Sequence, residues 1–326
     1  MIAEFLGLLL ILTAAAAVLS YGAEALADRY GANFTGSIVL AMITTLPEYM
    51  FVIWASVKGH YDMAVGSAVG SCALLITLGY GSVILFATTR ISRKPVKAIV
   101  LSKGTQVDAL YLLGTALIAF ALAWEGNGFD FKDAVILVLL FIAYVIHVAQ
   151  GAVKFARQNA VAGHSRTGLF KSLALLFIGG VTIFFCSEPF VDSMLEVATV
   201  LGVSPMTIAI ILGPLASEMP EKITAYITVI RDGGLAEISV CNFIGSKVNH
   251  NSLLLGTMPI IAILQGRSGV PGIISLPFIT MTALTVVATL SLSRRRLDSW
   301  QGVGFTLLYL LVIWGAFHVG VGRLSH

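Results

Sequence analysis

The sequence predicts an all-helical integral membrane protein of about ten transmembrane helices, arranged as two inverted five-helix repeats with broken helices at the membrane midplane. Three observations predict this fold class. The 326-residue chain is much more apolar than a soluble protein. Its apolar runs are long enough to cross a bilayer as helices. A short phrase containing Pro-Glu occurs once in each half of the chain.

Composition places the chain in a membrane. Only 11% of its residues are charged, 57% are hydrophobic before the 32 glycines are counted, and the mean hydropathy is +0.93. A soluble domain has about 25% charged residues, so this chain is too apolar for a water-facing surface. Cys72, Cys186 and Cys241 all lie in hydrophobic runs and predict neither a disulfide framework nor the spacing of a metal site.

Ten apolar segments are expected to form the membrane spans. The first segment lacks a basic leader and carries Glu4, so we expect a retained span rather than a signal peptide. The expected spans are Ile2–Tyr21, Phe34–Val57, Met63–Thr88, Val107–Trp124, Ala134–Val153, Leu169–Ser187, Ser204–Ile230, Leu235–Leu264, Val270–Leu292 and Gly302–Val319.

The charge of the connections predicts the orientation. The connections after spans three, five and nine are basic, whereas those after spans four and six (residues 188–196 in the latter) are acidic. Basic connections favour the cytoplasm, so both termini are expected outside, in the cell membrane. The polar stretch 156–167 is expected to be a cytoplasmic linker between a first five-helix repeat, residues 1–155, and a second, inverted one, residues 168–326.

The repeated phrase marks the same place in each half. Thr44–Glu48 reads Thr-Thr-Leu-Pro-Glu, and Ser217–Glu221 reads Ser-Glu-Met-Pro-Glu. A Gly-Ser pair follows each, at Gly70–Ser71 and Gly245–Ser246, with Pro-to-Gly spacings of 70 − 47 = 23 and 245 − 220 = 25. An odd number of spans per half makes the two copies face opposite ways. Proline inside a helix should split spans two and seven and free backbone carbonyls.

Carboxylates within membrane spans indicate a functional site, because burying them is costly. Thr44 and Glu48 share one helix face, as do Ser217 and Glu221, and Glu218 lies one turn from Glu221. Hard cations such as Ca²⁺ take about 6–8 oxygen ligands. The chain has no His/Cys cluster suited to zinc. The ligand set therefore favours Ca²⁺, Na⁺ or protons.

These motifs resemble those of the cation/calcium antiporter superfamily, which includes sodium/calcium and proton/calcium exchangers. The usual family phrase is Gly-Thr-Ser-Leu-Pro-Glu, followed by a helix that carries Gly-Ser-Asn. The resemblance implies secondary-active transport by alternating access. The ion ligands that it and the carboxylate pattern suggest are Thr44, Thr45, Glu48, Ser71, Ser217, Glu218, Glu221 and Ser246.

The chain departs from the family pattern near the second copy. Cys72 and Lys247 stand where the family has Asn, and Leu75 and His250 stand four residues after each serine. Glu218 replaces a hydroxyl residue of the family phrase. It is either an additional ion ligand or a residue at a water-filled entrance that does not touch the ion. Lys247 either substitutes for part of the charge of a sodium ion, pairs with Glu218, or extends to the membrane interface. Lys247 and His250 are the candidates for charge coupling, with packing as the alternative role of His250.

The expected function is secondary-active antiport, with Ca²⁺ exported in exchange for Na⁺ or H⁺. The alternative is a monovalent Na⁺/H⁺ antiporter on the same fold, which Lys247 favours. A channel has no need of an inverted repeat, and no catalytic motif indicates an enzyme. No cofactor is expected. The expected partners are inorganic cations and the lipid bilayer, with no nucleic acid and no obligate protein partner.

Overall fold

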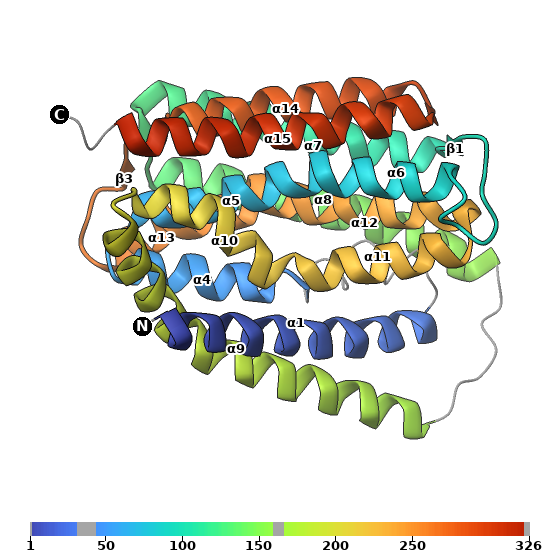
Figure 1. Cartoon of the computed structure of the whole chain (residues 1–326), viewed down its shortest axis with the longest axis horizontal. Coiled ribbons are helices and arrows are strands. Elements are labelled where there is room, and N and C mark those ends of the chain that lie inside the picture. Colours follow the sequence, from blue (N-terminus) through green and yellow to red (C-terminus); the bar gives the residue numbers. More distant parts are fainter. Residues whose placement is uncertain (1, 31–43, 159–165, 323–326) are drawn as a thin grey trace.

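The computed structural model describes residues 2–30, 44–158 and 166–322. Its helices lie side by side along the long axis of the molecule (Figure 1). The described first half consists of α1 (Ile2–Tyr30), α4 (Leu46–Val57), α5 (Tyr61–Leu74), the π-helix η2 (Leu75–Gly79), α6 (Tyr80–Thr88), β1 (Ile99–Val100), α7 (Lys103–Gly126), β2 (Gly128–Phe129) and α8 (Phe131–Gln158).

The second half repeats this helical character. It consists of α9 (Arg166–Leu201), α10 (Pro205–Ser217), α11 (Met219–Arg231), the 3-10 helix η3 (Gly233–Leu235), α12 (Ala236–Asn249), the π-helix η4 (His250–Leu254), α13 (Leu255–Leu264), β3 (Val270–Pro271), α14 (Leu276–Ser293), β4 (Arg296–Leu297) and α15 (Ser299–Gly322). Within the described residues, 6 helices are long and apolar enough to cross a membrane, and shorter apolar helices accompany them. The chain is thus a helical membrane protein.

Two three-part helices, one in each half, have the same construction. In α5–η2–α6 and in α12–η4–α13, a 14-residue α-helix leads into a 5-residue π-helix and then into another α-helix. Their starts differ by 236 − 61 = 175 residues, the same offset that separates the two Gly-Ser pairs, 245 − 70 = 175. Because π-helical turns are rare and concentrate at functional sites, this match extends the sequence repeat to the backbone.

The second Pro-Glu phrase breaks its span as predicted. Helix α10 ends at Ser217, α11 begins at Met219, and Glu218 lies at the bend between them. The bend keeps backbone hydrogen bonds, since the Glu218 N–H donates to the Pro214 carbonyl and the Lys222 N–H donates to the Glu218 carbonyl. Proline is tolerated in the first turn of α11, where its missing N–H would have no helical partner.

The first Pro-Glu phrase lies at the start of a helix. Thr45 forms a turn, and α4 begins at Leu46, with Pro47 in its first turn. The earlier part of the expected second span, residues 34–43, lies outside the described residues. The two phrases therefore both place a glutamate in the first turn of a helix, Glu48 in α4 and Glu221 in α11.

Helix α9 is longer than predicted. It runs for 36 residues and continues through Pro189, so the expected acidic loop 188–196 is helical. At 1.5 Å per residue its length is about 54 Å, which exceeds a hydrocarbon core of about 30 Å. The acidic residues thus occupy the end of a helix that is too long for the bilayer. Proline inside a membrane helix does not by itself end it.

Helices α5 and α10 pack with unusually close backbones. A Cβ on Gly66 would lie 2.7 Å from the Met206 carbonyl oxygen, and a Cβ on Gly70 would lie 2.6 Å from the Ile210 Cα. Small residues four apart let two membrane helices approach in this way. This contact holds the first half of the chain against α10, which ends at the second Pro-Glu phrase.

Short antiparallel ladders join the helix connections at the two ends of the bundle. β1 pairs with β4, with Ile99 opposite Leu297, and β2 pairs with β3, with Phe129 opposite Val270. β1 and β3 lie at opposite ends of the molecule (Figure 1). The β1–β4 ladder therefore brings two basic connections, those before α7 and before α15, to one end. Helix α1 begins and α15 ends at the other end (Figure 1).

Candidate cation site

Three carboxylates from the two Pro-Glu phrases are buried in the protein. Glu48, Glu218 and Glu221 are 2%, 1% and 4% exposed. Glu48 and Glu221 lie in the first turns of α4 and α11, and Glu218 lies at the bend between α10 and α11. The helix ends therefore set the positions of all three side chains. A carboxylate withdrawn from water needs hydrogen-bond donors or a cation as partner. The site must supply one or the other to each of these carboxylates.

The two phrases exchange hydrogen bonds. The Ser217 hydroxyl of the second phrase bonds to the Glu48 carboxylate, and the Thr44 hydroxyl of the first phrase bonds to Glu221. Thr44 corresponds to Ser217 and Glu48 to Glu221, because both pairs are separated by 173 residues (217 − 44 and 221 − 48). Each glutamate thus receives a hydroxyl group from the opposite half, as the convergence of the two copies requires.

Several oxygen atoms at these positions have no hydrogen-bond partner among the described residues. They are the Oε2 atoms of all three glutamates and the hydroxyl oxygens of Ser71 and Ser246. Both serines are fully buried, on α5 and α12. Every one of these residues belongs to the ligand set expected from the sequence. Carboxylate and hydroxyl oxygens are the ligands that hard cations take, so this donor set suits Ca²⁺ or Na⁺.

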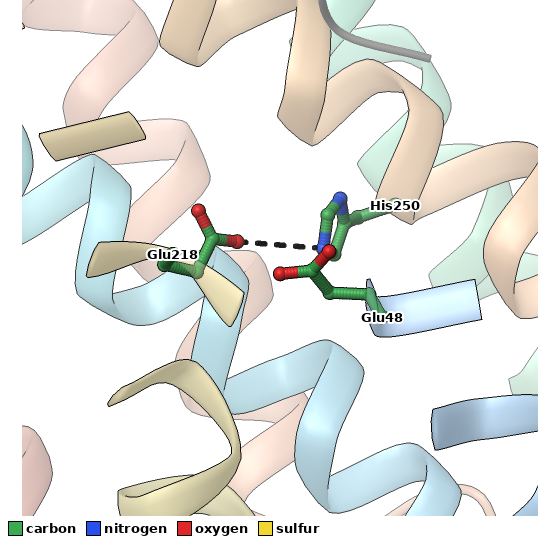
Figure 2. A group of neighbouring side chains, drawn as sticks. All are labelled: Glu48, Glu218 and His250. Atoms are coloured by element: carbon green, nitrogen blue, oxygen red, sulfur yellow. Dashed lines mark ion pairs between the residues drawn. The ribbon is translucent and has the colours of Figure 1, made fainter. Parts of the chain in front are cut away.

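The site contains a buried ion pair. The Lys247 Nζ atom of α12 lies 2.5 Å from Glu218 Oε1, and the two side chains are 0% and 1% exposed. His250, one turn further on, has a ring nitrogen 3.6 Å from the same carboxylate oxygen. Glu48, Glu218 and His250 point toward one another from three separate helical segments (Figure 2), with ligand atoms within 4.8 Å of each other.

The hydrogen bonds of His250 assign its tautomer. Its Nδ1 lies 2.8 Å from the Ser246 carbonyl oxygen, to which only an N–H can donate. We therefore place the ring proton on Nδ1. Nε2 is then an acceptor, and it lies 3.2 Å from Lys247 Nζ. The Lys247 ammonium thus has two acceptors, a carboxylate and an imidazole nitrogen.

Two amide side chains that no sequence motif indicates lie next to Lys247 and His250, Asn249 at the end of α12 and Asn251 in η4. Asn249 donates from Nδ2 to the Thr45 hydroxyl at 2.9 Å and accepts a hydrogen bond from the Tyr49 hydroxyl. Asn251 Oδ1 lies 3.8 Å from Cys72 Sγ. Both asparagines are 1% exposed. Asn249 therefore holds Thr45, an expected ligand, in a chain of hydrogen bonds that crosses between the halves.

A small cavity of about 10 Å³ reaches the site from one side. It is lined by residues of α1, α4, α5, α9 and α10, including Glu48, Ser67 and Ser217. A cavity of this size holds about one water molecule or ion. All ten residues singled out from the sequence are buried in the described structure, and contacts between side chains link seven of them. Those are Thr44 with Glu221, Ser217 with Glu48, and Glu218, Lys247 and His250 with one another.

Comparison with known proteins defines the class. A family model described as sodium/calcium exchanger protein matches residues 1–150 and 171–317. The chain therefore belongs to the sodium/calcium exchanger family, which confirms the resemblance seen in its motifs. It is accordingly a membrane protein of the cation-exchanger class.

Individual relatives span nearly the whole chain. An uncharacterized membrane protein of Methanocaldococcus jannaschii, MJ0091, is 26% identical over 297 residues, which are 90% of this chain and 90% of that protein. The crystal structure of the H⁺/Ca²⁺ exchanger CAX superimposes with a TM-score of 0.81 and 24% identity, over 98% of this chain and 85% of that one. The sodium-calcium exchanger NCX_Mj superimposes with a TM-score of 0.70 and 24% identity, over 96% and 97%. The protein has the fold of these exchangers.

Proposed function

We propose that the protein is a secondary-active cation antiporter that exports Ca²⁺ in exchange for Na⁺ or H⁺ by alternating access. The observation that carries this proposal is the convergence of buried carboxylates from both halves, each with an oxygen that has no protein donor among the described residues. The proposed ligands are Glu48 and Glu221, as the central pair, and the hydroxyl groups expected from the sequence, whereas Glu218 is paired with Lys247. The exchangers with a similar fold support a divalent cation as the substrate.

Charge explains why transport would be coupled. Ionised Glu48 and Glu221 in a medium of low dielectric constant repel each other and lack solvation. The empty, charged site is therefore too costly to carry across the barrier between the two access states. A bound cation or bound protons remove this cost. Exchange becomes obligatory because only the occupied site can change its access.

The proposed architecture is two inverted repeats, residues 1–155 and 168–326, joined by a cytoplasmic linker at 156–167. Support comes from the matched π-helical segments and from the family model, which covers one stretch in each half. The proposed site lies where the broken helices of the two repeats meet. We further propose that the protein lies in the cell membrane with both termini outside, because the basic connections lie at the end opposite the start of α1.

The second candidate is a monovalent Na⁺/H⁺ antiporter on the same fold. The buried Lys247–Glu218 pair favours it, because the lysine cancels one of the three carboxylate charges and reduces the charge available for a divalent ion. Both candidates use the same carboxylates and differ in their cargo. A single flux experiment therefore separates them.

The experiment measures calcium-45 uptake into proteoliposomes loaded with Na⁺ or held at an inside-acid pH, alongside sodium-22 uptake driven by the pH gradient alone. We expect calcium uptake that depends on the outward gradient. Glu48→Gln and Glu221→Gln should each abolish it and keep the fold. Glu125→Gln is the matched control, since Glu125 is a 69% exposed carboxylate that pairs with Lys132. Full calcium uptake in Glu48→Gln or Glu221→Gln refutes the site, and sodium uptake without calcium uptake selects the second candidate.

A further inference from the structure

The two copies of the site differ at one pair of positions in contact. Thr45 of the first copy corresponds to Glu218 of the second (218 − 45 = 173), and Cys72 corresponds to Lys247 (247 − 72 = 175). Both changes add a full charge of opposite sign. The structure joins the two charged residues directly, with Nζ 2.5 Å from Oε1. The second copy thus contains a carboxylate and its own cation where the first has only neutral groups.

The Lys247 ammonium group is buried and surrounded by acceptor atoms, as a bound cation would be. Lys247 is 0% exposed and contacts Glu218 on one side and His250 Nε2, at 3.2 Å, on another. The Ser246 carbonyl fixes the His250 ring at 2.8 Å. An ion pair in an apolar interior persists only when its groups are well placed and hydrogen-bonded. The Glu218 carboxylate and the His250 ring, which the Ser246 carbonyl holds in place, meet that requirement for Lys247.

We propose that Lys247 is a tethered cation, whose ammonium group permanently occupies a monovalent-cation position and neutralises Glu218. Glu48 and Glu221 then carry the charge that binds the transported ions. The site accordingly takes one divalent ion or two monovalent ions, and no soluble ion at Glu218. The number of transported ions rests on the proposed transport function. The position of the Lys247 ammonium group beside Glu218 is a property of the folded chain and does not depend on that function.

A second buried lysine does not compete for this role. Lys222 follows Glu221 on α11 and is 2% exposed. It is near enough to Glu218 and Lys247 to interact with their charges, but no ion pair joins it to a carboxylate in the part of the chain that the structure describes. Lys222 therefore provides a matched control: a buried lysine of the same site region without the carboxylate contact.

The first test counts bound Na⁺ in the purified full-length protein by equilibrium binding of sodium-22. Lys247→Ser removes the ammonium group, leaves space, and supplies a hydroxyl oxygen next to Glu218. We expect it to bind one more Na⁺ per chain than the wild type, and we expect Lys222→Ser not to. Adding Glu218→Gln to Lys247→Ser should remove the extra ion. An unchanged count in Lys247→Ser overturns the tethered-cation proposal.

The second test uses a double variant that is expected to fold even where the single one does not. Glu218→Gln with Lys247→Met replaces the ion pair by neutral groups of similar size, a change that buried pairs commonly tolerate. Because the pair has no net charge, the calcium affinity of the remaining carboxylates should stay within about tenfold of the wild type. A tenfold change in affinity corresponds to the same free energy as a pKa shift of about one unit. A loss above about a hundredfold would make Glu218 a direct ligand and overturn the proposal.

Flux measured in the same preparations separates this proposal from the antiport proposal. Wild-type protein that exchanges no cation refutes antiport, while the sodium count in Lys247→Ser still decides whether the ammonium group fills a cation position. Wild-type protein that exchanges calcium, with no extra Na⁺ in Lys247→Ser, refutes the tethered cation alone.

Discussion

The contact between α5 and α10 makes Gly70→Ala a sensitive test of how the site is positioned. The new Cβ would lie 2.6 Å from the Ile210 Cα, whereas ordinary contact begins at 3.4 Å, so the helices must separate by at least 3.4 − 2.6 = 0.8 Å. Helix α10 ends at Ser217, which bonds to Glu48. The separation therefore moves a residue of the site, and overpacking costs about 1–3 kcal/mol of stability.

We expect Gly70→Ala to reduce the exchange rate strongly while the protein still folds. A displacement of about 1 Å at a reactive site can cost about a hundredfold in rate, so we expect exchange by Gly70→Ala to fall at least tenfold. The melting temperature in detergent should fall by several degrees. Calcium-45 flux and tryptophan-fluorescence melting measure the two effects on one preparation.

Gly114→Ala is the matched control. Gly114 also lies inside a long helix, α7, but a Cβ there would meet nothing within 4 Å. Replacing a helical glycine by alanine then gains roughly 0.5–1 kcal/mol, so flux should stay within twofold and the melting temperature should not fall. If Gly70→Ala behaves like Gly114→Ala in both measurements, the close backbone contact does not position the site.

Three further predictions concern polar contacts, each checked by the free energy of unfolding in micelles. Lys247→Met leaves Glu218 buried without its cation and should cost about 3–5 kcal/mol, and adding Glu218→Gln should restore most of it; equal stability of the single and double variants contradicts the pairing. Lys58→Met breaks the surface ion pairs with Asp192 and Glu188, at 2.8 and 3.2 Å, and should cost less than about 1 kcal/mol. A larger loss would contradict its surface character. Asn249→Ala removes the amide that donates to the Thr45 hydroxyl and accepts from the Tyr49 hydroxyl, and it should cost about 1–3 kcal/mol; a neutral result would mean that those bonds are not formed.

Much of the fold follows from local sequence patterns. Apolar runs locate the helices, and the position of Pro220 locates the bend at Glu218, because proline is tolerated in the first turn of a helix. The end of α9 is the exception. Polar residues at 188–196 suggest a loop, but a membrane helix can extend beyond the bilayer and remain helical there.

The site is less completely predictable, because its contacts join distant parts of the chain. The carboxylates are evident as charges inside apolar runs. The bond from Asn249 to Thr45 joins residues 204 positions apart, and no local spacing indicates it. The same holds for Lys222, whose burial depends on the packing of α11 rather than on its neighbours in sequence. Which of the possible partners Lys247 takes is likewise decided by tertiary structure, which brings α12 to the bend at Glu218.

The most direct test of the central claim is to locate a divalent cation in a crystal of the protein soaked with calcium. The account predicts one ion between α4 and α11, with a carboxylate oxygen from both Glu48 and Glu221 at about 2.3–2.6 Å. An ion bound elsewhere, or bound by one half of the protein alone, would contradict it.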